Sequence, residues 1–158
     1  MKKIDLAYMA GILDGEGCIY ISKHKPKKRL NRSTVYCLGV TISMANAYIP
    51  KLFHFAFGGQ CFFDKTRLKK HPDFQPLWTY RAYADNAINC LRVLLPYLHL
   101  KRDEANLAIQ SHKKRLLPPN KKLTEEELAV REAQYLLMKS LKYKNEYPLT
   151  EKAEEVED

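Results

Sequence analysis

The stretch YMAGILDGEGCI, residues 8–19, decides how the rest of the chain is interpreted. Its apolar residues predict a helix over residues 6–14, for which Asp5 is a suitable N-terminal cap. Two acids between glycines, Asp14 and Glu16, follow at the helix end, where the backbone already carries partial negative charge. A divalent cation would offset that charge, and carboxylate and carbonyl oxygens are ligands suited to magnesium or calcium. Taken alone, the stretch fits a buried helix that ends in a polar turn at least as well as it fits a metal site.

Small residues form a stripe along the same helix. Gly11 costs a helix about 1 kcal/mol relative to alanine, and Ala7 and Gly15 lie four residues to either side of it. Such a stripe lets a second helix approach closely. The stretch occurs once in the 158 residues, so one chain provides one stripe and a second copy would be needed to pair with it. The sequence therefore predicts a symmetric homodimer with an interface over Ala7, Gly11, Asp14 and Gly15.

The remaining pattern predicts an α+β fold. Strands are expected over residues 18–23, 34–44, 60–65 and 77–84, and further helices over residues 47–57, 85–95, 101–112 and 124–144. The alternation is clearest in the second strand, where Leu38, Val40 and Ile42 share one apolar face. Two hairpins, each next to a helix, favour one four-stranded antiparallel sheet with helices on one face and the other face open to solvent or a ligand. Five aromatic residues are interpreted as core: Phe53, Phe55, Phe57, Trp78 and Tyr80.

The charge of the chain favours a polyanionic partner. The net charge is +9, and because the last eight residues carry a net −4, the other 150 carry +13. The four cysteines lack the spacing of a zinc site and are expected to be free thiols. No apolar run reaches the length of a membrane helix, and the N-terminus lacks the pattern of a signal peptide. We therefore expect an intracellular protein with one domain over residues 1–147 and an acidic, disordered tail over residues 148–158.

Residues 9–17 resemble the LAGLIDADG motif of homing endonucleases, with methionine at its first position and Glu16 at its second acid. Farther on, LLPYL at residues 94–98 and KRDEANL at residues 101–107 resemble the segment that ends the core of that family, and the order of elements over residues 5–112 matches as well. The resemblance implies an αββαββα core with extra C-terminal helices. It also implies two motif helices packed across a twofold axis, and a four-stranded sheet that lies in the major groove of DNA.

The resemblance also implies the active-site residues. These are Glu16 and the backbone carbonyl of Gly15 at the metal, Lys101 and, more loosely aligned, Lys51 as basic residues, and Asn46 where relatives often have a water-positioning glutamine. Asp14 is expected to cap or orient the helix end. The implied cofactor is Mg²⁺, with Mn²⁺ as a substitute, and Ca²⁺ is expected to support binding without cleavage.

Contacts with double-stranded DNA are expected on the open sheet face and at the hairpin tips. Basic residues of the first tip would contact phosphates: Lys25, Lys27, Lys28, Arg29 and Arg32. Contacts with base edges, or from the second tip, would come from Tyr20, Ser22, Arg32, Ser33, Thr41, Ser43, Lys65, Arg67, Lys69, Lys70, Thr79, Arg81 and Tyr83. Each of these residues, considered singly, fits a solvated surface position equally well.

The resemblance implies an intron-encoded homing endonuclease of a prokaryotic cytoplasm, chloroplast or mitochondrion. As a homodimer it would hydrolyse both strands of a long, near-palindromic DNA target and leave short 3′ overhangs. The alternative is a nucleic-acid binder on the same scaffold that does not cleave, either an intron RNA maturase or a transcription factor.

Overall fold

The computed structural model describes residues 1–25, 34–65, 68, 72–113 and 123–144. The elements, in chain order, are α1 (Lys3–Glu16), β1 (Gly17–His24), β2 (Val35–Met44), α2 (Tyr48–Phe57), β3 (Gln60–Asp64), β4 (Leu77–Tyr83), α3 (Ala84–Leu94), a 3₁₀ turn η2 (Leu95–Tyr97), α4 (Arg102–Lys113) and α5 (Glu125–Lys144). This order confirms the expected core, αββαββα, followed by extra C-terminal helices.

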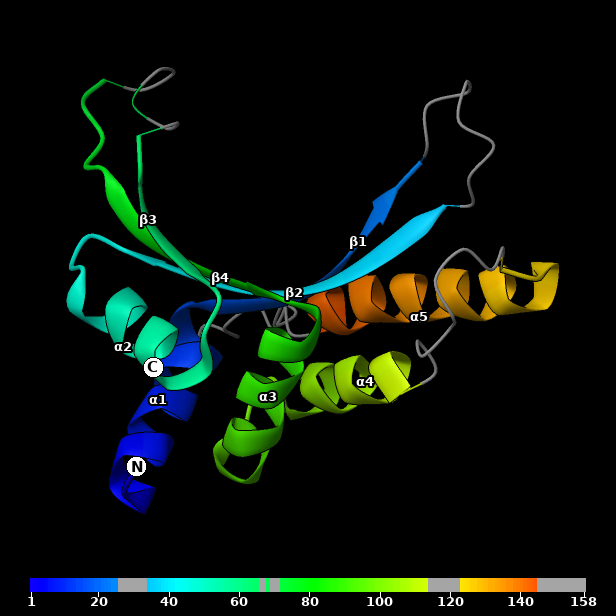
Figure 1. The fold of residues 1–158 in the computed structure, drawn as a ribbon, viewed down its shortest axis with the longest axis horizontal. Coiled ribbons are helices and arrows are strands. Elements are labelled where there is room, and N and C mark those ends of the chain that lie inside the picture. Colours follow the sequence, from blue (N-terminus) through cyan, green and yellow to red (C-terminus); the bar gives the residue numbers. More distant parts are fainter. Residues whose placement is uncertain (26–33, 66–67, 69–71, 114–122, 145–158) are drawn as a thin grey trace, which may run out of the picture.

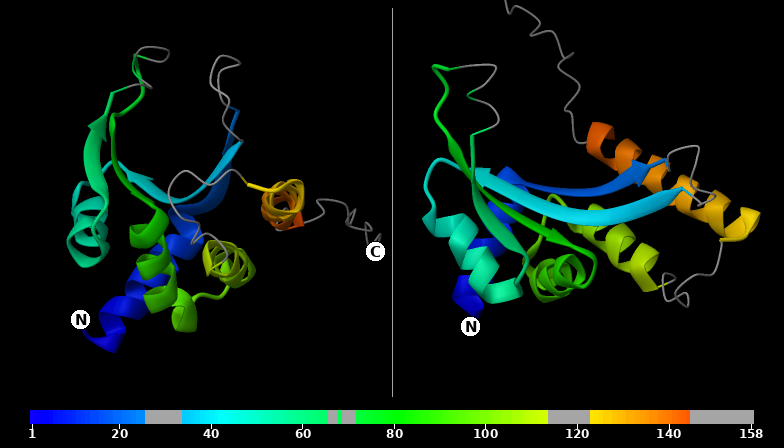
Figure 2. Two further views of the ribbon diagram at one scale, coloured as in Figure 1. Left: turned by 45° about the vertical axis from the view of Figure 1, so that its right-hand side comes forward. Right: turned by 45° about the horizontal axis from the view of Figure 1, so that its top comes forward.

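The four strands form one antiparallel sheet in the order β1-β2-β4-β3. The sheet curves strongly, and all five α-helices lie on its convex side (Figure 1). The two hairpins rise on either side of the opposite, concave face, which no described helix covers (Figures 1 and 2). Sequence reasoning therefore predicted the architecture correctly, including the open face.

The hydrophobic core fills the space between the sheet and the helices. Leu38, Val40 and Ile42 of β2 are buried on the helix side, as their alternation predicts. The last element, α5, runs along β1 beside α4 (Figure 2). It is held there by Glu132, which accepts hydrogen bonds from Lys23 of β1 and Tyr36 of β2.

Two local expectations are wrong. Helix α1 begins at Lys3, so Asp5 is not the capping residue but lies inside the first turn, where its carboxylate accepts a hydrogen bond from the Lys2 backbone at 2.9 Å. Phe55 is 83% exposed, whereas Phe53 and Phe57 are buried. Residues four apart share a helix face, and a residue midway between them points to the other side. The interpretation of Phe55 as a core residue is therefore wrong.

None of the helices in the described part of the chain is long and apolar enough to cross a membrane.

Candidate active site and nucleic-acid interface

Asp14 joins the end of α1 to a segment that follows it by more than eighty residues. Its carboxylate is 8% exposed and accepts hydrogen bonds from the backbone of His99 at 2.8 Å and of Lys101 at 2.9 Å. The Lys101 ammonium in turn donates to the Asp14 carbonyl. Asp14 therefore orients the helix end, in agreement with the sequence expectation. Its carboxylate faces its own chain and not the exposed stripe with which the sequence grouped it.

Glu16 is the last residue of α1, and β1 begins at the next residue, Gly17. A Cβ atom on Gly17 would lie 2.6 Å from the Leu13 carbonyl oxygen, so the direct passage from helix to strand requires glycine there. Gly15 and Glu16 are both exposed. The turn therefore presents a carboxylate and a backbone carbonyl at the helix end.

These groups are suitable for a hard divalent cation, because carboxylate and carbonyl oxygens are its preferred ligands. Across the described residues, however, no three His, Cys, Asp or Glu side chains gather closely enough to hold a metal ion.

Two charged residues near this turn were not anticipated from the sequence. Glu104 is 3% exposed, and its Oε2 has no hydrogen-bond partner in the described structure. Burial raises the pKa of Glu104, while the nearby Lys101 and Lys142 act in the opposite direction. Lys142 belongs to α5 and reaches the Cys18 sulfur at 3.0 Å. Helix α5 therefore places a second lysine, Lys142, near the start of β1, two residues after the end of α1.

The remaining two catalytic candidates have other contacts. The Asn46 side-chain oxygen accepts a hydrogen bond from the Tyr48 backbone at 2.8 Å, so it closes the first turn of α2. The Lys51 ammonium lies 4.9 Å from the centre of the Trp78 ring, on the helix side of the sheet. The structure links Lys101 directly to the end of α1 and gives no such link for Asn46 or Lys51 within its described residues.

The small-residue stripe lies on an open face of α1. Ala7, Gly11 and Gly15 are all exposed, and a Cβ atom added to Gly11 or Gly15 would meet nothing within 4 Å. Ile4 and Tyr8 beside them are 74% and 55% exposed. An apolar face of this kind, on a helix that is otherwise buried through Met9 and Leu13, is typical of an interface.

The described DNA-binding candidates lie on the concave sheet face or just beyond the ends of its strands. Lys25 and Lys65 are exposed, and the Arg81 guanidinium lies 5.2 Å from the centre of the Phe62 ring. The remaining DNA-binding candidates at the two hairpin tips lie outside the described residues: Lys27, Lys28, Arg29, Arg32, Ser33, Arg67, Lys69 and Lys70.

Small polar side chains on this face bond within the sheet. The Ser22 hydroxyl donates to the Cys37 carbonyl at 3.2 Å, and the Thr41 hydroxyl donates to the Tyr80 carbonyl at 3.0 Å. Ser43 and Thr79 bond to each other at 2.9 Å. Thr79 differs from the exposed position expected for it, because it is only 3% exposed in the middle of the sheet.

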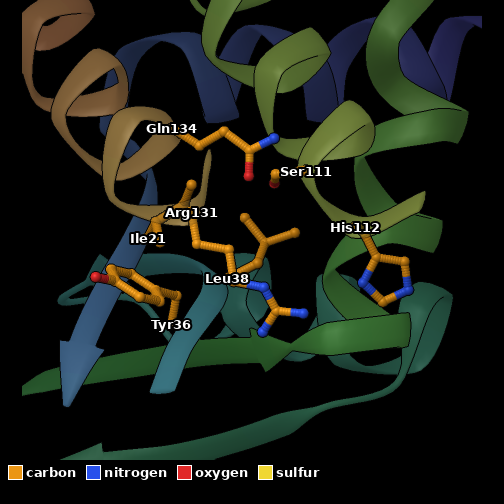
Figure 3. A pocket seen from close by; sticks show the side chains of 7 residues that line it. All are labelled: Ile21, Tyr36, Leu38, Ser111, His112, Arg131 and Gln134. Carbon is orange, nitrogen blue, oxygen red and sulfur yellow. The ribbon is translucent and has the colours of Figure 1, made fainter. Parts of the chain in front are cut away.

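A small cavity lies elsewhere, between the sheet, α4 and α5 (Figure 3). Its volume of about 20 Å³ accommodates roughly one water molecule. It is lined in part by His112, whose Nε2 bonds to Asp85 at 3.0 Å. The cavity is too small for a substrate, so the exposed α1 end and the concave face are the better candidates for function.

Comparison with solved structures identifies the fold. One similar structure is the homing endonuclease I-CvuI, solved in complex with a DNA target. The superposition covers 88% of this chain and 82% of the I-CvuI chain, with a TM-score of 0.69 and 21% sequence identity. The archaeal intron-encoded homing endonuclease I-Vdi141I, also complexed with DNA, matches 89% of this chain over 86% of its own, with a TM-score of 0.70 and 12% identity. The LAGLIDADG homing endonuclease I-LtrWI, bound to target DNA, matches 85% of this chain over 44% of its own, with a TM-score of 0.59 and 15% identity.

The chain has the LAGLIDADG homing endonuclease fold. No protein-family model matches its sequence, and no curated protein matches it either. The fold expected from residues 9–17 is thereby confirmed by structure.

Proposed function

We propose that this protein is a DNA endonuclease that acts as a homodimer and cuts both strands of a near-palindromic target with the help of magnesium. The observation that carries the proposal is the end of α1. There an exposed Glu16 and Gly15 adjoin an exposed small-residue stripe, and Lys101 is bonded to the same helix turn.

The stripe supplies the dimer. Two copies of α1 that pack through Ala7 and Gly11, about a twofold axis that runs along the helix pair, bring their last turns together. Both helices then end at the same end of that axis. Each subunit then contributes one Glu16 carboxylate and one Gly15 carbonyl to the junction. Two half-sites make a site with enough oxygen ligands for divalent cations.

The chain's own residues would perform distinct parts of phosphodiester hydrolysis. When bound, a divalent cation supplies a Lewis acid that activates water and offsets charge on the phosphate. Glu16 would hold that cation, together with the Gly15 carbonyl. Lys101 uses one of its three N–H groups on the Asp14 carbonyl, so the other two remain to stabilise the negative charge that develops on the phosphate.

The concave sheet face is the proposed DNA-binding surface. It is open and lies between two hairpins, Arg81 of β4 belongs to it, and Lys25 and Lys65 are exposed just beyond the ends of β1 and β3. A curved two-hairpin surface of this kind suits the major groove, which is wide enough to admit strands. The structures of I-CvuI and I-Vdi141I in complex with DNA support this assignment by fold analogy.

A selection followed by cleavage tests the proposal. The protein would first select sequences from a random double-stranded DNA library in calcium, and the selected DNA would then receive magnesium. We expect cleavage of both strands by the wild type and retained binding without cleavage by Glu16→Gln, since the amide keeps the size of the side chain but loses its charge. Binding without cleavage by the wild type would favour a non-cleaving DNA binder. No selected DNA at all would contradict both.

A further inference from the structure

A row of three residues crosses the centre of the concave face. Tyr20 of β1 pairs with Gly39 of β2, and Gly39 pairs on its other side with Tyr83 of β4. Residues opposite one another in neighbouring strands point to the same face, so the row consists of two tyrosines with a glycine between them. It lies next to the row that contains Thr41 and Arg81.

The Tyr20 ring lies across Gly39. A Cβ atom on Gly39 would meet the Cζ, hydroxyl and Cε2 atoms of Tyr20 at 2.5–2.8 Å, so any other residue there would displace the ring. This overlap also explains why Gly39 is buried although it belongs to the open face. Glycine at this position serves close approach and not backbone freedom, because its φ is not in the left-handed region.

Tyr83 fixes the far end of the ring. Burial, and then a hydrogen bond with the Tyr83 side chain, raise the pKa of Tyr20 well above its ordinary value. Tyr83 is itself 44% exposed and borders an open hollow of the same face with His24 and Cys37. The Tyr20 ring therefore lies against Gly39, with its hydroxyl toward Tyr83.

Neighbouring small polar groups are also occupied. Ser22 and Thr41 flank the row, and both donate their hydroxyl hydrogens to backbone carbonyls of the sheet. A base edge that approaches the centre of the row therefore meets the Tyr20 ring between two hydroxyl groups that already bond within the sheet. In the major groove, the apolar feature that distinguishes one base from the others is the C5 methyl group of thymine.

We propose that the row Tyr20–Gly39–Tyr83 is a specificity element that recognises a thymine methyl group through the flat face of the Tyr20 ring. The inference rests on the proposed DNA-binding function and adds the chemistry of one contact. Gly39 acts as a positioning residue, since its lack of a side chain lets the ring lie against it. Tyr20 contacts the methyl group directly, and Tyr83 holds the ring in place.

The test removes the methyl group from the DNA. After the preferred target is selected in calcium, each thymine is replaced in turn by uracil, which lacks only that methyl group. Burial of one methyl group is worth about a threefold to fivefold change in affinity. We expect such a loss at one symmetric pair of positions for the wild type.

Gly39→Ala and Tyr20→Ala should bind the thymine and uracil targets equally well at those positions. Gly39→Ala is the more informative variant, because only the end of a flexible side chain must move to accommodate the added methyl group. Arg81→Ala is the matched control on the adjacent row and should keep the sensitivity to uracil. Equal sensitivity in all variants, or no uracil-sensitive position in the wild type, would overturn the inference while leaving DNA binding intact. Failure to select any DNA would instead count against the proposed function.

Discussion

The two acids of the α1 turn should respond in opposite ways to the same chemical change, carboxylate to amide. In Asp14→Asn, one side-chain oxygen remains as an acceptor, but an NH₂ group must replace the other. That group would face a backbone N–H of His99 or Lys101, both of which now donate to Asp14 at 2.8–2.9 Å. The variant therefore loses one hydrogen bond to a charged group and leaves a buried donor without a partner.

The expected loss of stability follows from these contacts. A hydrogen bond to a charged group contributes about 1.5–3 kcal/mol, and a buried group without a partner costs a comparable amount, so Asp14→Asn should lose about 3 kcal/mol. For a chain of this size, the corresponding fall in Tm is about 6–12 °C. Glu16 is exposed, and Glu16→Gln should change the stability by less than about 0.5 kcal/mol.

Thermal unfolding and cleavage, measured on both variants, separate the two roles. At a temperature where Asp14→Asn is fully folded, it should still cleave, but about a hundredfold more slowly, because a shift of about 1 Å in Lys101 misplaces its ammonium group. Glu16→Gln should be fully stable and inactive. A stable but inactive Asp14→Asn would mean that Asp14 binds the metal, and a strong loss of stability in Glu16→Gln would mean that Glu16 is structural.

Three further changes test the interface, the DNA surface and the packing of α5. Gly11→Leu should weaken the dimer in sedimentation while leaving the subunit folded, because a Cβ atom at this exposed position meets no described residue within 4 Å; a stable, active dimer would place the interface elsewhere. DNA binding should weaken steeply with salt, and the slope should flatten by about one unit per lost phosphate contact in an alanine variant of Lys27, Lys28 and Arg29; an unchanged slope would exclude those contacts. The hydrogen bond from Lys23 lowers the pKa of Glu132. The stabilisation that the ionised Glu132 provides is therefore fully present above the ordinary glutamate pKa of about 4.3, and it is lost as the pH falls through the lowered pKa. Urea unfolding should therefore show the wild type more stable than Glu132→Gln at pH 7, with the difference gone at low pH; a difference that persists in acid would refute the role of the ion pair.

The elements could be predicted because local chemistry determines them. Alternating residues in β2 place Leu38 and Val40 on one face, and the pair of acids between glycines marks the passage from α1 to β1. The failures are also local in origin. Phe55 belongs to an aromatic cluster in the sequence, but the helical period turns it away from Phe53.

The hydrogen bonds and packing contacts of the site could not be predicted in the same way, because they join residues that are distant in the sequence. Nothing near Asp14 in the sequence indicates that it accepts hydrogen bonds from residues 99 and 101. The approach of Lys142 to Cys18 likewise depends on how α5 lies along β1. Thr79 matches the polar pattern of an exposed strand face, yet its neighbours in the sheet bury it.

Mapping the cut positions on both strands of the selected DNA target tests the central claim most directly. One motif per chain, with the proposed half of a metal site at the end of α1, predicts a target sequence with approximate twofold symmetry. In magnesium, each strand should be cut once, at positions related by that symmetry axis, and Glu16→Gln should cut neither. Cleavage of a single strand, cuts unrelated to any symmetry axis, or full activity of Glu16→Gln would contradict the account.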